Sequence, residues 1–386
     1  MNYYCTYFDR NYLPRALALF ESLERFETGP YKVFAVCLDE VSRLALRRIR
    51  PHGVTSVALH EIEVGDEPLL AARADRTLVE YYWTMTPCIM LRLLARIPDG
   101  DSLVYLDADM YFYSAPEPIF EEFEGYDAFI HEHRFGPEIQ HFSVTAGRFN
   151  VGLVGIRNNR NGQEILTWWR ERCLEWCFNR FEDGKFGDQL YLDQWPERFE
   201  KIRVCEHPGV GLAPWNHDQV IIGFSEDGVM MVNDLRLIIY HFHAYVCIAR
   251  GLHLASNFRY AMPPEMLAYC HRPYSRALDY QHEVLRGIFP DHAFGLNPDF
   301  QIAPKHTVVQ SNESTRVVTS LEQVVPLRPS GLSTRLSHPL KALTVDGRIA
   351  AWRMVINALK VLGAAGIAKT WEQSKLGRLI KKYHSQ

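Results

Sequence analysis

Two aspartates, Asp107 and Asp109, stand two residues apart directly after the largely apolar run Ser102–Leu106. This run predicts a short buried strand, so the carboxylates would lie at the carboxyl end of a strand, where open α/β sheets bind ligands. Such a pair supplies hard oxygen ligands for one divalent cation, Mn²⁺ or Mg²⁺. A cation held there stabilises the negative charge that builds up on a departing diphosphate. The alternative is an acidic pair that only caps the next turn, which the preceding strand and the following aromatic residues disfavour.

The elements that must position this pair follow an α/β pattern. Over the first 60 residues, apolar runs alternate with segments of helical periodicity. The predicted elements are the strand Tyr3–Phe8, the helix Leu13–Leu23, the strand Val33–Leu38, the helix Val41–Ile49 and the strand Val54–Leu59. Strands that alternate with helices favour a mostly parallel sheet covered on both faces, an architecture that often binds nucleotides.

The pattern continues on both sides of the acidic pair. Helices are predicted over residues 79–97 and Gly162–Phe181, a strand over Phe149–Ile156 and a short helix over Gly187–Gln194. Val229–Val232 and Leu235–His241 predict a hairpin whose turn is Asn233-Asp234.

Three short motifs follow one another along the chain: Tyr105-Leu-Asp107-Ala-Asp109, Phe149-Asn150-Val-Gly152 and Gly187-Asp188-Gln189. In this order they resemble retaining GT-A glycosyltransferases, most closely glycosyltransferase family 8 and related bacterial cell-surface polysaccharide glycosyltransferases. The resemblance covers roughly residues 1–245. It implies a GT-A fold, which is a Rossmann-like mixed sheet flanked by helices, here with a helical C-terminal extension. It also implies a hexosyltransferase that uses a nucleotide-diphosphate sugar, with uridine as the expected base.

The resemblance assigns roles to residues near the donor. It places Thr6, Tyr7, Asp9 and Tyr12 of the first strand and loop around the base and ribose. Arg92 corresponds to a family arginine near the donor. The Asn150 amide and the small residue Gly152 would lie at the donor sugar.

Two further residues would act on the opposite face of the sugar. By resemblance Asp188 anchors a sugar hydroxyl, and Gln189 stabilises positive charge at the anomeric carbon. The alternative for Asp188 is a helix N-cap, a common position for aspartate.

The third metal ligand expected from the resemblance is a histidine, and here the sequence departs from the family pattern His-X-X-Gly-X-X-Lys-Pro-Trp. His207 keeps the spacing to Pro214-Trp215 but has Ala213 where the family has lysine. His241 follows a predicted strand, as the aspartates do, and is the favoured ligand; His207 and His243 remain alternatives. Trp215 and Asn216 would then belong to an acceptor-side loop. The missing lysine leaves Arg250 or Arg259 as candidates to neutralise the diphosphate.

The chain is expected to contain three parts: a catalytic domain over residues 1–265, an extension and linker over 266–345, and a tail over 346–386. The tail has eight basic residues against two acidic ones, and its apolar residues recur at helical spacing. Such a basic amphipathic helix fits an anionic membrane surface or packing against the catalytic domain equally well.

Overall composition narrows the remaining possibilities. With 42 basic and 46 acidic residues, the net charge of −4 gives no reason to expect nucleic acid as a partner. The eight scattered cysteines favour free thiols in a reducing compartment. No secretory signal is visible at the start, so a cytoplasmic protein is expected, with the tail as its one route to the membrane face.

Two other functions compete with glycosyl transfer. A haloacid-dehalogenase-type phosphatase also places Asp-X-Asp after a buried strand and would use Asp107 as the nucleophile. A non-catalytic nucleotide-sugar-binding module would keep the fold without turnover. The expected acceptor of a transferase is a hydroxyl of a glycan or glycolipid destined for the cell surface.

Overall fold

The computed structural model describes residues 1–256, 260 and 262–297, together with the strands β16 (Val308–Gln310) and β17 (Arg316–Val318). Contacts divide the chain into two units, Met1–Asn297 and Pro298–Gln386. In the second unit β16 and β17 pair antiparallel, and the predicted tail 346–386 lies outside the described residues. The domain boundaries expected at residues 265 and 345 remain predictions.

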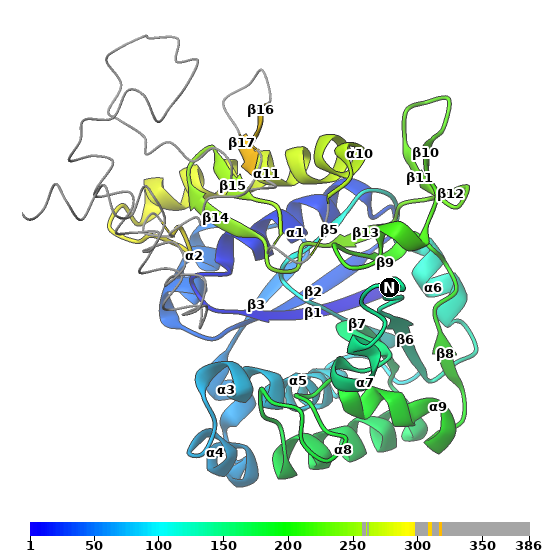
Figure 1. Cartoon of the computed structure of the whole chain (residues 1–386). Coiled ribbons are helices and arrows are strands. Elements are labelled where there is room, and N and C mark those ends of the chain that lie inside the picture. Colours follow the sequence, from blue (N-terminus) through cyan, green and yellow to red (C-terminus); the bar gives the residue numbers. More distant parts are fainter. Residues whose placement is uncertain (257–259, 261, 298–307, 311–315, 319–386) are drawn as a thin grey trace, which may run out of the picture. The chain divides into compact units, whose positions relative to one another are not determined.

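The centre of the first unit is a sheet of seven strands (Figure 1). In spatial order the strands are β3 (Val54–Ala58), β2 (Tyr31–Cys37), β1 (Asn2–Phe8), β4 (Ser102–Leu106), β7 (Phe149–Arg157), β6 (Ala128–Glu132) and β8 (Ile202–Val204). Strand β7 pairs antiparallel with both β4 and β6, whereas the other pairs are parallel. The sheet is therefore mixed but dominated by parallel pairs.

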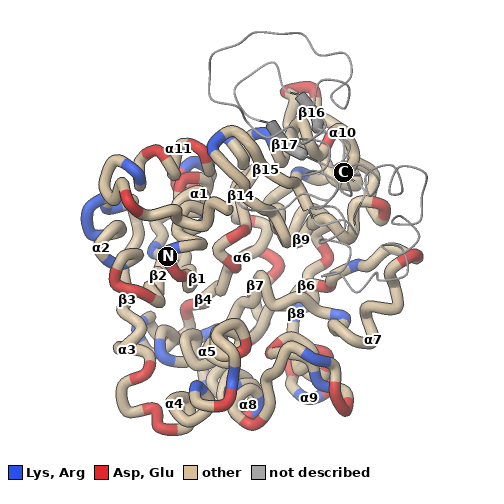
Figure 2. Tube along the Cα trace, turned by 60° about the vertical axis from the view of Figure 1, so that its left-hand side comes forward, with Lys and Arg blue, Asp and Glu red and all other residues tan. Residues whose placement is uncertain are grey.

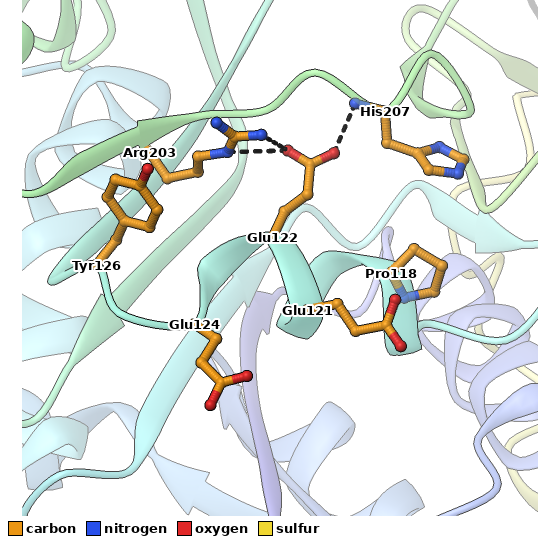
Figure 3. Close-up of a pocket in the computed structure, with 7 residues that line it drawn as sticks. All are labelled: Pro118, Glu121, Glu122, Glu124, Tyr126, Arg203 and His207. Atoms are coloured by element: carbon orange, nitrogen blue, oxygen red, sulfur yellow. Dashed lines mark hydrogen bonds and ion pairs between the residues drawn. The ribbon is translucent and has the colours of Figure 1, made fainter.

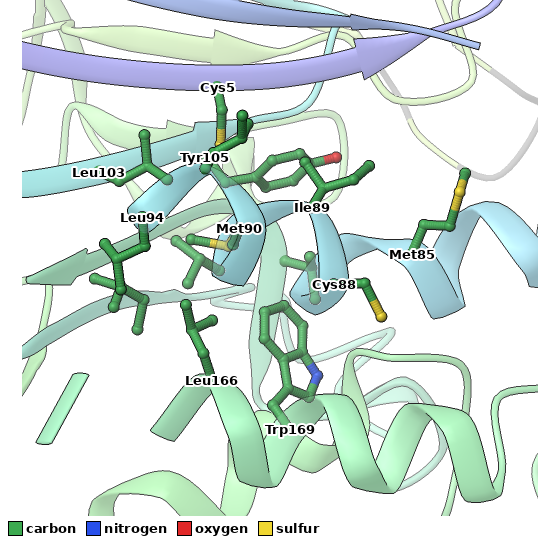
Figure 4. Close-up of a cluster of buried hydrophobic side chains, with 14 of the residues drawn as sticks. Cys5, Met85, Cys88, Ile89, Met90, Leu94, Leu103, Tyr105, Leu166 and Trp169 are labelled. Carbon is green, nitrogen blue, oxygen red and sulfur yellow. The ribbon is translucent and has the colours of Figure 1, made fainter. Parts of the chain in front are cut away.

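Helices cover both faces of this sheet because successive strand side chains point to opposite sides. Tyr3 and Cys5 of β1 belong to one hydrophobic cluster, and Tyr4 and Phe8 belong to the other. The first cluster is closed by α3 (Leu59–Glu63), α4 (Glu67–Arg73), α5 (Leu78–Leu94), α8 (Arg160–Glu175) and α9 (Trp195–Arg198). Its centre, around Met90, Leu166 and Trp169, is drawn in Figure 4.

The second face is covered by a different set of helices. They are α1 (Leu13–Phe26), α2 (Glu40–Ile49), α6 (Glu117–Phe123) and α11 (Arg272–Ile288). Helix α11 packs directly on α1, so the end of the unit is anchored on its beginning. The α/β class with a mixed sheet flanked by helices, predicted from the sequence, is confirmed.

Smaller elements surround the sheet. The three strands β5 (Met110–Phe112), β13 (Ile239–His241) and β9 (Val210–Leu212) form one small sheet, and β10 (Ile222–Phe224), β11 (Met230–Val232) and β12 (Leu235–Arg236) form another. Strands β14 (Val246–Ala249) and β15 (Leu252–Leu254) form a hairpin. The short helical segments are α7 (Phe142–Ala146), η1 (Leu190–Gln194), η2 (His217–Gln219), α10 (Pro264–Met266) and η3 (Leu267–His271).

Three predicted elements differ from the structure. Helix α8 ends at Glu175, not Phe181, because Trp176 adopts an extended conformation while still buried, so the apolar pattern outlasts the helix. The helix expected over Gly187–Gln194 is a 3₁₀ turn that begins at Leu190. The strand expected over Leu235–His241 splits into β12, which completes the hairpin around Asn233-Asp234, and β13, which joins a different sheet.

Charges of both signs are interspersed along the helices, with several arginines on α2 (Figure 2). Within the described residues no helix is both long enough and apolar enough to cross a membrane.

Candidate metal and substrate site

The acidic pair lies where strand β4 ends. The backbone N–H of Asp107 still pairs with the Gly152 carbonyl of β7 at 2.8 Å, and the chain then turns, with Met110 N–H donating to the Asp107 carbonyl. The turn leads into β5, so both aspartates sit between two strands whose positions are fixed by pairing. The Asp107 side chain is 34% exposed and that of Asp109 is 13% exposed. Both carboxylates are therefore partly accessible to solvent.

Strand β13 brings His241 to the same place. Because β13 pairs antiparallel with β5, His241 is opposite Met110, and Phe242 N–H donates to the Asp109 carbonyl at 2.9 Å. The His241 Nε2 atom lies 3.3 Å from Asp109 Oδ1 and 3.6 Å from Asp107 Oδ2. One ligand atom from each of the three residues lies within 4.8 Å of the others.

The charges of this cluster depend on one another. Burial raises the pKa of the Asp107 carboxyl, and His241 only partly offsets this. Burial alone would also raise the pKa of Asp109, but His241 lowers it below the usual range. Burial alone would lower the pKa of His241, yet the two carboxylates raise it. Two carboxylate oxygens and an imidazole nitrogen are a donor set that suits Mn²⁺ and also accepts Mg²⁺, so the residues fit a divalent cation.

A third acidic residue, Asp188, contacts helix α5. Its side chain is 5% exposed, its carboxylate accepts from the Thr86 hydroxyl of α5 at 2.9 Å, and its backbone carbonyl accepts from Trp169 Nε1. Burial, together with the charge of Asp107, raises the pKa of Asp188 to about 7. The following 3₁₀ turn begins at Leu190 with Gln189 as its N-cap, so Asp188 does not cap it.

Hydroxyl groups and stacked rings connect Asp188 with Asp107. Thr86 Oγ1 lies 3.0 Å from the Tyr7 hydroxyl, the Tyr7 ring stacks on Tyr105 at 5.6 Å, and the Tyr105 hydroxyl donates to Asp107 at 2.6 Å. Thr86 and Tyr105 had no role in the sequence prediction. The side-chain period of two in β4 would have placed Tyr105 beside Asp107, whereas no local signal marks Thr86.

No family model matches the sequence. The Bacillus subtilis protein YfnD is 27% identical over 309 residues, which cover 79% of this chain and 98% of YfnD. The Bacillus subtilis protein YfnF is 32% identical over 248 residues, which cover 63% of this chain and 81% of YfnF. The chain belongs to the YfnF family. Both Bacillus proteins are described as uncharacterized, so membership of the YfnF family assigns no reaction.

Two solved structures that are similar to this chain are glycosyltransferases. The galactosyltransferase LgtC, solved with donor and acceptor sugar analogues, matches with a TM-score of 0.45 and 13% identity, covering 72% of this chain and 96% of LgtC. Mouse xyloside xylosyltransferase 1 matches with a TM-score of 0.40 and 15% identity, covering 62% of this chain and 96% of the mouse protein. Both likenesses are remote, and the chemistry of this YfnF-family protein must be argued from its own residues.

Asn150 and Gln189 of the YfnF-family protein lie together. Gln189 Oε1 accepts from Asn150 Nδ2 at 3.1 Å, while Gln189 Nε2 donates to the Ala146 carbonyl. The Asn150 amide also lies 3.1 Å from His133 Nε2. Burial lowers the pKa of His133 to about 3, so His133 is neutral and completes the pair as a partner that the sequence did not reveal.

Gly152 has a steric reason to be glycine. A Cβ atom at this position would lie 2.7 Å from Asn150 Oδ1 and 2.9 Å from the His241 ring. The absence of a side chain therefore lets the histidine reach the two aspartates.

The first loop of the YfnF-family protein is built around Asp9. Its carboxylate accepts from the backbone N–H groups of Asn11 and Tyr12 at 2.9 and 3.1 Å. Thr6 is buried in β1, and the Tyr12 ring is 44% exposed. The partly exposed Tyr12 ring of this loop interacts electrostatically with Asp109 of the candidate metal cluster.

Other sequence-predicted residues lie in different surroundings. Arg92 is exposed on α5 and donates to the Val64 carbonyl. It lies six residues beyond Thr86, which is about 9 Å along the helix axis. Trp215 and Asn216 are buried and both donate to the His133 carbonyl, and Trp215 packs edge-on against His241. Their roles in substrate binding stay predictions.

The histidines considered as the third metal ligand lie in different parts of the fold. His207 lies at a surface pocket of about 460 Å³ next to α6, where Glu122 accepts from the His207 backbone N–H and from Arg203 (Figure 3). His243 is exposed and packs against Trp215. Arg250 pairs with Glu283, and Arg259 lies outside the described residues. Of the three histidines considered, His241 is the one that joins the aspartates.

Proposed function

We propose that this chain is a metal-dependent glycosyltransferase of the GT-A type that transfers a hexose from a nucleotide-diphosphate sugar to a hydroxyl group. The observation that carries the proposal is the convergence of Asp107, Asp109 and His241, which come from two separate sheets, at the carboxyl end of β4. Aspartates and a histidine so placed are suited to hold a cation against a diphosphate.

The proposed donor is a uridine-diphosphate sugar, and the proposed cofactor is Mn²⁺ or Mg²⁺. When bound, the cation supplies Lewis-acid stabilisation of the leaving diphosphate. Asp107 and Asp109 contribute the charge that attracts it, and His241, held close by Gly152, completes the donor set.

The remaining residues are proposed to shape the donor and acceptor sites. Tyr7, Thr6, Asp9 and Tyr12 surround the base and ribose, with Arg92 nearby. The Asn150 and Gln189 amides, already bonded to one another, face the sugar, and Asp188 anchors a sugar hydroxyl. Trp215 and Asn216 form the base of the acceptor side. We further propose that the reaction retains the anomeric configuration, since the order of the motifs resembles that of retaining enzymes.

The acceptor is proposed to be a glycan or glycolipid of the cell surface, modified on the cytoplasmic side. The catalytic part would lie within residues 1–265, and the basic tail 346–386 would hold the protein at the membrane face. The intervening residues 266–345 would serve as an extension and linker.

The phosphatase alternative is not favoured. A haloacid-dehalogenase nucleophile is expected after the first strand, whereas Asp107 follows the fourth strand of the chain. Its nearest polar partners are a tyrosine hydroxyl and His241. The binding-module alternative is separated from the proposal by measuring turnover.

The test is to incubate the purified chain with a panel of nucleotide sugars and Mn²⁺ and to measure release of nucleoside diphosphate. We expect nucleoside diphosphate to be released from at least one uridine-diphosphate sugar. We also expect a chelator of divalent cations to abolish this release. Asp109→Ala should reduce the rate by at least about 100-fold. Asp227→Ala, which changes a carboxylate that is 63% exposed on the β10–β11 turn, is the matched control.

Three outcomes would overturn the proposal. Near-normal turnover in Asp109→Ala defeats the metal assignment, and phosphate release from phosphomonoesters supports the phosphatase. Donor binding without any turnover, read as a thermal shift, supports the binding module. Nuclear magnetic resonance of the first-formed product then decides whether the anomeric configuration is retained.

A further inference from the structure

A second group of buried titratable side chains lies between α1, the β14–β15 hairpin and α11. Its members are Arg15, Cys247, His253, Asp279 and His282. Cys247 is 1% exposed, His253 is fully buried, and Arg15 and His282 are 7% and 6% exposed. Charged groups enclosed in this way are costly unless opposite charges or hydrogen bonds balance them.

The fold fixes the geometry of this group. Cys247 and His253 are directly opposite one another in the antiparallel pairing of β14 with β15, so their side chains are neighbours on one face. Asp279 accepts from the Gly251 N–H at 2.9 Å and lies 3.0 Å from His253 Nε2. His282 stands one helical turn after Asp279 on α11.

Several donor groups near Cys247 have no anionic hydrogen-bond partner among the described residues. Arg15 donates to two neutral acceptors, the carbonyl oxygens of Tyr245 at 2.9 Å and Asn11 at 3.3 Å. His253 Nδ1 and His282 Nε2 are buried and have no hydrogen-bond partner among the described residues. Arg15, His253 and His282 all interact electrostatically with the Cys247 thiol, as do Tyr245 and Tyr274.

Titration behaviour agrees with this geometry. Burial alone would raise the pKa of Cys247, but Arg15, followed by His253 and His282, lowers it to about 5. Burial alone would lower the pKa of His253, yet Asp279 and Cys247 raise it to about 9. Burial instead raises the pKa of Cys37 and Cys205 to about 12.

Arg15 also joins two loops of the proposed active site. Asn11 belongs to the loop that precedes α1, and Tyr245 lies four residues beyond His241. The guanidinium carbon of Arg15 stands 4.5 Å from the centre of the Tyr12 ring. A single buried side chain therefore connects the first loop with the segment that follows His241.

We propose that Cys247 is held as a buried thiolate that balances the charge of Arg15, and that Arg15 is a positioning residue for the donor-binding loop and the metal-site loop. The thiolate is a property of the folded chain alone. The positioning role of Arg15 rests on the function proposed above.

The first experiment detects the thiolate directly and does not depend on enzymatic turnover. The ultraviolet absorbance of the full-length chain at neutral pH is compared with that of Cys247→Ser, because a thiolate absorbs where a thiol does not. We expect the wild-type chain to carry one additional thiolate band, and Cys205→Ser, the matched control, to leave it unchanged. Equal spectra for the wild-type chain and folded Cys247→Ser would overturn the thiolate assignment.

The second experiment separates charge from geometry at Arg15. Arg15→Met should remove the thiolate band, whereas Arg15→Lys should keep the charge and the band. Because lysine cannot span both carbonyl oxygens, Arg15→Lys should raise the donor KM about tenfold with a smaller change in kcat. Arg25→Met, on an exposed position of α1, is the control. A thiolate band that persists in Arg15→Met would overturn the charge balance.

An unchanged donor KM in Arg15→Lys would overturn the positioning role. If the wild-type chain proves to have no turnover, the proposed function fails by itself, and the thiolate comparison still stands. Binding of Mn²⁺ with uridine diphosphate, measured by thermal shift, then replaces KM, and equal affinities of the wild-type chain and Arg15→Lys would refute positioning.

Discussion

At the scale of single residues, the site depends on how closely the His241 ring can approach the two aspartates. His241 reaches the two aspartates only because Gly152 has no side chain, and Asn150 fills the other side of the same space. The second ring nitrogen of His241, Nδ1, is buried and has no hydrogen-bond partner among the described residues, so packing against Gly152 is what fixes the ring.

Gly152→Ala should therefore displace His241. We expect the affinity for Mn²⁺ to fall about tenfold and the stability to fall by about 1–3 kcal/mol, because the new methyl group would overlap two neighbours. Gly223→Ala is the matched control, since a Cβ there meets no atom within 4 Å. Manganese binding followed by electron paramagnetic resonance measures the effect, and equal affinities in the two variants would contradict the steric argument.

Asp188 predicts a dependence of stability on pH. Because the pKa of its folded form is raised to about 7, the native state binds a proton that the unfolded state has already lost between about pH 4 and 7. Ionised Asp188 therefore destabilises the fold as pH rises through this window. Asp188→Asn cannot ionise, and its melting temperature relative to the wild type should rise from pH 5 to pH 8 in the presence of a chelator. Parallel melting curves across this range would exclude the raised pKa.

At the scale of elements, helix α5 connects the two halves of the site. It begins with a capping box in which Thr77 and Glu80 exchange hydrogen bonds, and one turn of its buried face presents Thr86 to both Tyr7 and Asp188. The same helix packs against α8, which holds the Asp188 backbone through Trp169.

Thr86→Val tests this connection with a side chain of nearly the same shape. Loss of the hydroxyl leaves the Asp188 carboxylate without its donor, so we expect a destabilisation of about 1–3 kcal/mol and a lower turnover. Thr86→Ser retains the hydroxyl and should recover most of both. Denaturant unfolding and the diphosphate-release assay measure the two effects, and a serine variant as impaired as the valine variant would argue against the hydrogen bond.

The sequence predicted those elements that carry their own local pattern. Strand β4 and the acidic pair could be predicted because a five-residue, largely apolar strand is followed directly by Asp107. Helix α8 was predicted too long because buried Trp176 and Cys177 continue the apolar pattern past its end. His241 was preferred from its place after a strand, and the structure brings it to the aspartates.

Contacts between distant residues could not be predicted. Thr86 bonds to a residue 102 positions away, and Arg15 bonds to one 230 positions away. Neither threonine in an apolar helix nor arginine in an amphipathic helix is unusual, so only the folded chain reveals their partners. The same holds for His133, which reads locally as one more strand-end histidine.

At the scale of the whole molecule, the remaining prediction concerns the tail. If residues 346–386 form a basic amphipathic helix, removing them should release the protein from vesicles that contain anionic lipid, and raised salt should weaken binding of the full chain. Co-sedimentation of the full chain and of residues 1–345 measures this. Equal sedimentation of both would assign membrane binding to another part of the chain.

The arrangement of the metal ligands has a consequence for biosynthesis. Asp109 and His241 are far apart in the chain, and β5 finds its antiparallel partner only when β13 is present. A nascent chain that has emerged from the ribosome only through β7 already carries both carboxylates but lacks the histidine. If the three residues hold a cation as proposed, the complete ligand set forms late in synthesis, and a product that ends before β13 would lack it.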